Sequence, residues 1–177
     1  CSQIILMENG KSQFQGNDVG KAIDLYYKRF AQNESNVVFD DGSIKLDEVK
    51  MVDFIGGKVI SKLNWNEDIT FYFNFILKKE MQTPLFNIII MDKEQRPVAL
   101  LERNNIKSEI IKSVYELEFY VTHKKIQLSK GIYSVSIAVL KSENEEPLLR
   151  INDVLSFQII HEFENWQPFL LKTNYES

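Results

Sequence analysis

The sequence predicts an all-β fold: an immunoglobulin-like or jelly-roll antiparallel β-sandwich, preceded by a short β-hairpin and one α-helix. From residue 44 onward, segments rich in β-branched and aromatic residues recur at short intervals, and turn-forming or charged stretches separate them. Several of these segments alternate apolar and polar residues, which is typical of strands with one buried and one solvent-facing side. No second helical pattern interrupts them. The expected strands are 44–54, 59–63, 68–78, 85–91, 97–102, 114–122, 132–140, 148–151 and 154–160.

The N-terminal region is predicted to be a hairpin followed by a helix. Residues 3–7 and 11–15 flank Asn9-Gly10, and this dipeptide is a strong signal for a tight hairpin turn. Apolar residues then recur at helical spacing, which predicts one amphipathic helix. The residues on this stripe are Val19, Ala22, Ile23, Tyr26, Tyr27 and Phe30.

The chain divides into three parts by this pattern. Residues 1–31 hold the hairpin and the helix, and residues 32–42 lose the helical period and are rich in polar turn formers. We therefore expect a linker at 32–42 and a sandwich over 43–177.

Alternation within the strands predicts which side chains form the core. In 68–78 the odd-numbered residues from Ile69 to Leu77 are apolar, so Tyr72 and Asn74 are expected on the opposite, wet face. In 132–140 the residues Tyr133, Val135, Ile137 and Val139 are expected inside. Ser134, Ser136 and Ala138 are then outside, where their small side chains would leave a shallow depression between longer neighbours.

Composition and motifs exclude several classes of function. The net charge of -4 gives no concentrated positive field, so nucleic acid is not an expected partner. One cysteine rules out an intrachain disulfide, and the two histidines lie far apart in sequence, so no metal or other cofactor is expected. The stretch 16–22 is one residue short of a phosphate-binding loop and ends in Ala22 where the magnesium-binding hydroxyl belongs. The sequence therefore predicts a protein that is not an enzyme.

Two groups of residues leave alternatives open. Glu116 and Glu118 would lie about 7 Å apart on one strand face, which allows a glycosidase pair, although two surface acids are the simpler interpretation. Trp65 and Trp166 are candidate sugar-stacking platforms, although tryptophan more often fills a core or an interface.

The first 31 residues resemble the end of an ABC-transporter nucleotide-binding domain of the polysaccharide-export branch. There, a strand pair that opens with cysteine is followed by a glycine and a helix with a late tyrosine. The matching residues here are Cys1, Ile4, Ile5, Leu6, Gly10, Gly16, Ala22, Ile23 and Tyr26. The ATP-handling motifs of such a domain would precede Cys1.

The remainder resembles the C-terminal carbohydrate-binding domain of Wzt-type ATP-binding subunits of O-antigen ABC transporters. Two motifs carry this resemblance: the strand pattern Pro-x-Phe-x-Ile-x-Ile-x-Asp at 84–92 and the Gly-x-Tyr opening of a late strand at 131–133. Gly57 ahead of the long strand 68–78, and the strand 157–159, agree with it.

The resemblance implies a function and a setting. Such a domain binds the non-reducing end of a finished O-antigen polysaccharide and couples this recognition to export. It implies a cytoplasmic location, peripheral to the inner membrane, with a membrane-spanning transporter subunit as partner. It also implies a homodimer in which the C-terminal segment 166–171 exchanges between protomers.

We expect glycan binding through hydrogen-bonding and aromatic side chains on a wet sheet face, because sugar hydroxyls pair well with amides, carboxylates and hydroxyls. Arg103 would bind an acidic terminal sugar. The alternative is a module that only dimerises or docks the transporter without binding glycan. The candidate carbohydrate-binding residues are Tyr72, Asn74, Arg103, Glu118, Tyr120, Ser134, Ser136 and Gln158.

Overall fold

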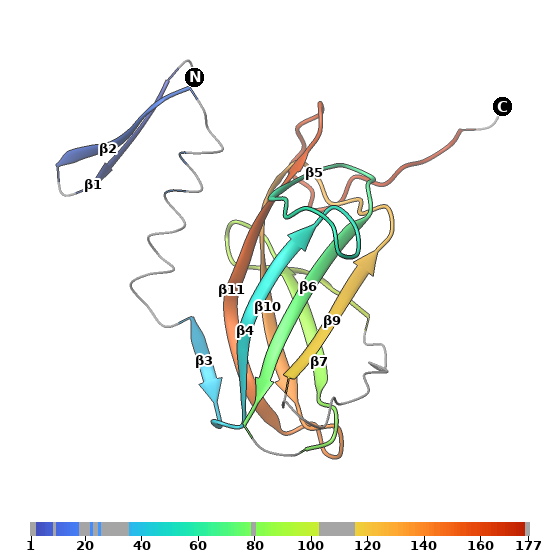
Figure 1. Cartoon of the computed structure of the whole chain (residues 1–177). Coiled ribbons are helices and arrows are strands. Elements are labelled where there is room, and N and C mark those ends of the chain that lie inside the picture. The colour runs from blue at the N-terminus through green and yellow to red at the C-terminus, as the bar shows by residue number, and fades with distance from the viewer. Residues whose placement is uncertain are drawn as a thin grey trace. The chain divides into compact units, whose positions relative to one another are not determined.

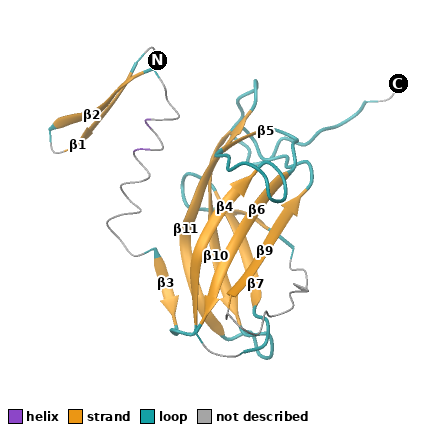
Figure 2. Cartoon of the chain, in the orientation of Figure 1, coloured by secondary structure: helices purple, strands orange, loops and turns teal. Residues whose placement is uncertain are grey.

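The computed structural model divides the chain into two compact units, Cys1–Asn36 and Val37–Ser177. It describes residues 3–8, 10–17, 22, 25, 36–78, 81–102 and 116–175. Within these ranges the chain is almost entirely strand and loop, as Figure 2 shows. Each unit is described by itself.

The first unit contains the predicted hairpin. β1 (Ile4–Glu8) and β2 (Lys11–Gly16) pair antiparallel. Gly10 lies in the turn with a φ of 75°, a left-handed conformation that costs glycine little because it has no Cβ. Ala22 and Leu25 have helical backbone, and the rest of the predicted helix lies outside the described residues.

The second unit contains nine described strands. In chain order they are β3 (Val37–Asp40), β4 (Ile44–Val52), β5 (Lys62–Asn64), β6 (Ile69–Leu77), β7 (Leu85–Met91), β8 (Pro97–Leu100), β9 (Glu116–His123), β10 (Gly131–Leu140) and β11 (Pro147–Ile160). The fold class predicted from the sequence is confirmed, because these strands form two sheets that face each other.

The larger sheet has the order β3-β11-β10-β7-β8, and β5 also pairs with β11. The smaller sheet has the order β4-β6-β9. Figure 1 shows the three-stranded sheet lying in front of the larger one. All pairings are antiparallel except that between β5 and β11, which is parallel.

Aromatic side chains hold the two sheets together. Phe86 on β7 contacts Phe75 on β6 and Phe119 on β9, with ring centroids 4.9 and 4.8 Å apart. Phe71 and Phe157 make a second contact between the sheets at 5.7 Å. Full burial of one such ring stabilises a fold by roughly 1.5–3 kcal/mol. These aromatic contacts between the sheets are therefore a main source of the stability of the sandwich.

The predicted alternation holds in the core. All five odd-numbered residues from Ile69 to Leu77 are buried, as are the four inward residues of β10, Tyr133, Val135, Ile137 and Val139. Because strand periodicity is two, this result fixes Tyr72 and Asn74 on the outer face of the small sheet.

The structure differs from the sequence prediction in two places. Val37–Asp40, expected in the linker, forms β3 and pairs with Leu149–Ile151 at the edge of the larger sheet. The two segments predicted as 148–151 and 154–160 are one strand, β11, with a register irregularity opposite 135–137. Asp153 sits in this irregularity with a φ of 50°, so the strand bends there without ending.

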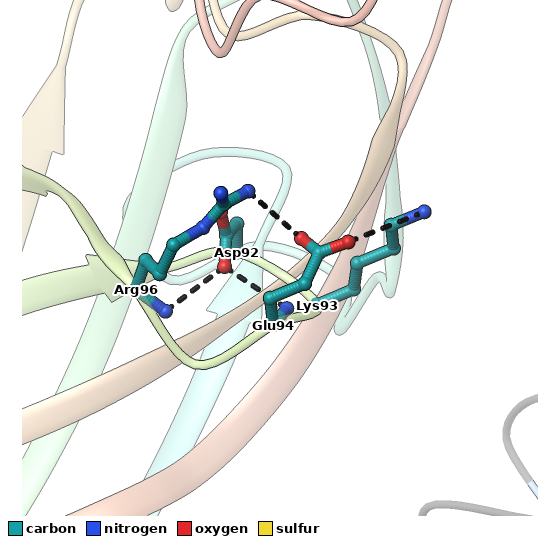
Figure 3. Close-up of polar contacts among 4 residues, drawn as sticks. All are labelled: Asp92, Lys93, Glu94 and Arg96. Atoms are coloured by element: carbon teal, nitrogen blue, oxygen red, sulfur yellow. Dashed lines mark hydrogen bonds and ion pairs between the residues drawn. The ribbon is translucent and has the colours of Figure 1, made fainter.

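The turn between β7 and β8 is closed by one carboxylate, as Figure 3 shows. Asp92 Oδ1 accepts hydrogen bonds from the backbone N–H of Glu94 and of Arg96, both at 2.9 Å, and Oδ2 accepts one from Arg96 Nε at 2.8 Å. Partial burial opposes the charge, but the Arg96 bonds prevail and lower the pKa of Asp92. Arg96 Nη2 also contacts Glu94 Oε2 at 3.1 Å.

Candidate functional site

The structure divides the predicted site residues between the two outer faces of the sandwich. Tyr72, Asn74, Glu118 and Tyr120 gather on the outer face of the three-stranded sheet. The other described candidates, Ser134, Ser136 and Gln158, belong to β10 and β11 on the outer face of the larger sheet. Packed sheets lie about 10 Å apart, so a single sugar residue cannot contact both groups. Arg103 lies outside the described residues.

Two tyrosines form the centre of the first group. Tyr72 on β6 and Tyr120 on β9 are directly paired in register, and their ring centroids are 5.2 Å apart at an angle of 51°. Tyr120 is 39% exposed, so its ring is available to a ligand. Paired aromatic rings on one sheet face make a rigid apolar surface with a phenol hydroxyl at its margin.

The phenol of Tyr72 lies beside negatively charged side chains. Burial, the charge of Glu118 and a hydrogen bond to Glu118 raise the pKa of Tyr72 to about 12, with smaller contributions from Glu48 and Tyr120. The phenol is protonated at neutral pH, as tyrosine ordinarily is, and donates to the Glu118 carboxylate.

Asn74 occupies the next position of this face along β6. Its Nδ2 donates to Glu116 Oε1 at 2.6 Å, and the opposite amide orientation would place Oδ1 against that carboxylate. Asn74 is only 6% exposed, and its Oδ1 has no hydrogen-bond partner in the part of the chain that the structure describes. An unpaired buried acceptor is costly, so the bond from Nδ2 to Glu116 and the surrounding packing must offset this cost.

Sequence reasoning missed the contribution of β4. Register places Glu48 beside Asn74 and Lys50 beside Tyr72. Lys50 Nζ lies 2.6 Å from Glu48 Oε1 and 5.5 Å from the centre of the Tyr72 ring. A register irregularity between Leu46 and Glu48 shifts the alternation of this strand by one residue, so a strict period of two does not show this face.

The margins of the face are also defined by hydrogen bonds. Thr70 and Thr122 lie at one end of the face, next to the Tyr72–Tyr120 pair, and their hydroxyls form a hydrogen bond of 3.0 Å. Ile76, which is partly exposed, extends the face at the other end of β6. We name the whole surface the tyrosine face and define it by Glu48, Lys50, Thr70, Tyr72, Asn74, Ile76, Glu116, Glu118, Tyr120 and Thr122.

The serines on the opposite sheet are engaged with β11. Ser134 and Ser136 are 7% and 3% exposed. Ser134 Oγ donates to Asp153 Oδ1 at 2.5 Å, and the Asp153 backbone N–H donates to Ser136 Oγ at 3.3 Å. Both hydroxyls are therefore already engaged, because the bend of β11 brings Asp153 to them.

The two tryptophans differ in their surroundings. Trp65 is half-buried, its Nε1 donates to the Leu170 carbonyl at 2.8 Å, and its ring meets His161 edge-on at 5.0 Å. This hydrogen bond thereby connects the C-terminal segment, residues 166–171, to the sandwich of the same chain. That segment also pairs with Gln127 and Ser129 through backbone hydrogen bonds. Trp166 is 89% exposed.

Two kinds of feature are absent from the described residues. These residues contain no cluster of three or more His, Cys, Asp or Glu side chains suited to a metal ion. No helix in the same ranges is long and apolar enough to span a bilayer.

Fold and face together define a β-sandwich module with a polar and aromatic sheet surface. The family model of the Wzt C-terminal domain matches residues 36–168. The chain therefore belongs to the Wzt C-terminal domain family. Among solved structures, the crystal structure of the C-terminal domain of Wzt superposes with a TM-score of 0.63 at 14% identity, covering 78% of this chain and 86% of that chain.

Two further solved structures match less well. A Niemann-Pick type C2 protein from the Japanese carpenter ant has a TM-score of 0.43 at 14% identity and covers 69% of this chain and 98% of that one. The alkylpurine DNA glycosylase AlkC of Pseudomonas fluorescens, bound to DNA with an abasic site analog, has a TM-score of 0.42 at 12% identity, covering 66% and 30%. No curated protein matches the chain in sequence.

Family membership relates the chain to O-antigen ABC transporters, in which an ATP-binding subunit works with a membrane subunit. It implies a cytoplasmic, membrane-associated setting. The sequence resemblance of the sandwich to this family is confirmed, and residues 1–35 and 169–177 lie outside the match.

Proposed function

We propose that the tyrosine face binds the non-reducing terminal end of an O-antigen polysaccharide without altering it, and that this binding couples completion of the glycan to its export. The arrangement of Tyr72 and Tyr120 carries the proposal. An aromatic ring suits the C–H face of a pyranose, and the surrounding carboxylates accept hydrogen bonds from sugar hydroxyls.

Preorganisation of this face supports the proposal. Asn74 is bonded to Glu116, Tyr72 to Glu118, and Lys50 to Glu48, so most polar side chains are fixed before a ligand arrives. Ordering of flexible side chains on binding costs about 0.5–1.5 kcal/mol for each. A prearranged face therefore retains more of the modest energy that a sugar residue can provide.

The tyrosine face is favoured over the opposite sheet by the state of the polar groups. Ser134 and Ser136 already bond with Asp153 and are buried. Gln158 is the one described candidate on that sheet outside this arrangement. A ligand there would have to break existing hydrogen bonds to use either serine.

A non-catalytic role agrees with the placement of Glu116 and Glu118. Both project from the same side of one strand, and each is hydrogen-bonded to a fixed neighbour on β6. A glycosidase pair must flank the bond that it cleaves. If the module were instead such an enzyme, Glu118→Gln would abolish hydrolysis of an oligosaccharide that the parent protein cleaves.

The test is calorimetric titration of the whole chain with O-polysaccharides that carry or lack their terminal modifications. We expect saturable binding that requires the intact terminus and that falls about tenfold in Tyr120→Ala. Gln158→Ala, on the other sheet, is the matched control and should bind like the parent. Equal loss in both variants, or loss in Gln158→Ala alone, would reject the tyrosine face.

A second function, docking or dimerisation without glycan binding, is favoured by exposed apolar side chains at one end of the sandwich. Phe54 and Ile55 in the β4–β5 loop and Phe163 and Trp166 after β11 are all more than half exposed. Exchange of segment 166–171 between two copies belongs to this proposal. It predicts a stable dimer by light scattering and no glycan binding.

We also propose that residues 1–31 form the C-terminal end of a nucleotide-binding domain.

A further inference from the structure

The charges of the tyrosine face are distributed unevenly between its strands. On β4, Lys50 pairs with Glu48 at 2.6 Å, and Lys45 lies 3.9 Å from Asp47. On β9, Glu116 and Glu118 form no ion pair within the described ranges and are bonded instead to the neutral donors of Asn74 and Tyr72. The β9 side therefore carries two negative charges without a described counter-charge.

The behaviour of Tyr72 agrees with this distribution. After burial, the charge of Glu118 is the largest cause of its raised pKa, and Glu48 adds to it. A second anion placed beside the phenol would meet the same repulsion that disfavours the tyrosinate.

Hydrogen-bonding capacity on the β9 side is also one-sided. Glu116 and Glu118 offer carboxylate oxygens as acceptors, whereas Asn74 Oδ1 is buried away from a ligand. Of the described donors at the centre, the Asn74 amide and the Tyr72 hydroxyl are already engaged, and the exposed Tyr120 contributes a neutral hydroxyl. Phosphate and carboxylate groups bring acceptors and negative charge, so on the β9 side they would meet two carboxylates and no described cation, and Lys50 on β4 is already paired with Glu48.

We infer that the terminal sugar bound at the tyrosine face carries no negative charge, and that an amino sugar with a free ammonium group binds best. The inference rests on the proposed function. An ammonium donates three hydrogen bonds and complements Glu118, whereas hydroxyl and N-acyl groups satisfy the acceptors without the charge.

The test uses the whole chain and three series of methyl glycosides, with gluco, galacto and manno rings. Each series contains the parent sugar, the 2-amino sugar, its N-acetyl form and the uronic acid. Binding at millimolar concentrations is followed by NMR shifts of the backbone amides of Tyr72, Asn74 and Tyr120. In at least one series we expect the amino sugar to bind about fivefold more tightly than the neutral parent, and the uronic acid most weakly.

Two variants separate charge from shape. Glu118→Gln keeps an acceptor but removes the charge, and should reduce the amino-sugar preference to about twofold or less. Glu94→Gln removes one charge from the β7–β8 turn of the other sheet and should retain the preference. High salt should weaken amino-sugar binding and leave the neutral parent unchanged.

The outcomes distinguish the two proposals. Binding at the tyrosine face with the uronic acid tightest, or with no difference among the four forms, would overturn the charge inference and leave glycan binding standing. Shifts confined to other parts of the chain, or absent in all three series, would reject the proposed function at this face and the inference with it.

Discussion

Ser134 on β10 donates a hydrogen bond to the carboxylate of Asp153 on β11 at 2.5 Å, although the two residues are 19 positions apart in sequence. The Asp153 N–H donates in turn to Ser136, so one residue of the bend is held by two hydroxyls of the neighbouring strand. Asp153 adopts a left-handed φ of 50°, which aspartate tolerates better than most residues. These contacts allow β11 to continue through its irregularity.

Replacement of Asp153 should separate hydrogen bonding from backbone strain. Asp153→Ala loses the bond from Ser134 and places a less tolerant residue at positive φ, so we expect a loss of about 2 kcal/mol in the free energy of unfolding. Asp153→Gly loses the bond but relieves the strain and should lose about 1 kcal/mol less. Urea unfolding measures both. Equal losses would show that the left-handed conformation costs nothing here.

Tyr72 should be one of the last tyrosines to ionise. The pKa values of Tyr72 and Tyr133 are both raised to about 12, each by burial first; the charge of Glu118 adds to the first and that of Asp92 to the second. In an alkaline absorbance titration, Tyr72→Phe should reduce the late-ionising fraction. Glu118→Gln should make Tyr72 ionise earlier. An unchanged late fraction in Tyr72→Phe would contradict the assigned environment.

The raised pKa values of Tyr72 and Tyr133 make the stability of the folded protein depend on pH at high pH. The unfolded chain releases these protons near pH 10, whereas the folded chain retains them to about pH 12. Stability should therefore be complete below pH 10 and fall as the pH rises from 10 to 12. Thermal unfolding across this range should show a shallower fall in the Tyr72→Phe, Tyr133→Phe double variant than in the parent.

Asp92 should stabilise the β7–β8 turn in a pH-dependent manner. Asp92→Asn keeps the size of the side chain but weakens the bonds to Glu94 and Arg96, and we expect a loss of about 1 kcal/mol at neutral pH. Because the pKa of Asp92 is below its ordinary value of 3.8, its contribution is present above that pH and disappears as the pH falls through the lowered value. Chemical unfolding at several acidic pH values should show the variant and parent converging; a constant difference would argue against a charge effect.

Trp65 and Trp166 form a matched pair for the C-terminal segment. Trp65→Phe removes the donor to the Leu170 carbonyl, so the segment should become more sensitive to proteolysis and the protein should lose about 1 kcal/mol of stability. Trp166→Phe changes a side chain that is 89% exposed and should leave both unchanged. Limited proteolysis followed by mass spectrometry locates the cut. Faster cleavage in Trp166→Phe alone would indicate that Trp166, not Trp65, holds the segment.

The sequence predicted correctly which side chains of a strand face the core wherever apolar and polar residues alternate without interruption. Residues 69–77 and 133–139 place aromatic and aliphatic side chains at every second position, and their burial agrees. Alternation failed at the irregularity near Asp47, because one extra residue reverses the facing of all that follow. At Asp153 the register shifts by two residues, so the facing of the strand is the same on both sides of that irregularity. The sequence contains no local signal for either irregularity that is stronger than an ordinary polar residue.

Sequence alone determined the all-β class, the hairpin at Asn9-Gly10 and the core of each sheet, because these depend on short-range spacing of residue types. Only the tertiary structure decided which polar residues share a surface. Tyr72 meets Tyr120, and Asn74 meets Glu116, through strand pairing between segments more than 40 residues apart. Ser134 and Ser136 were separated from that surface because the two sheets stack with their outer faces turned away from each other. Register and sheet order are set by packing of the whole core, which no local pattern encodes.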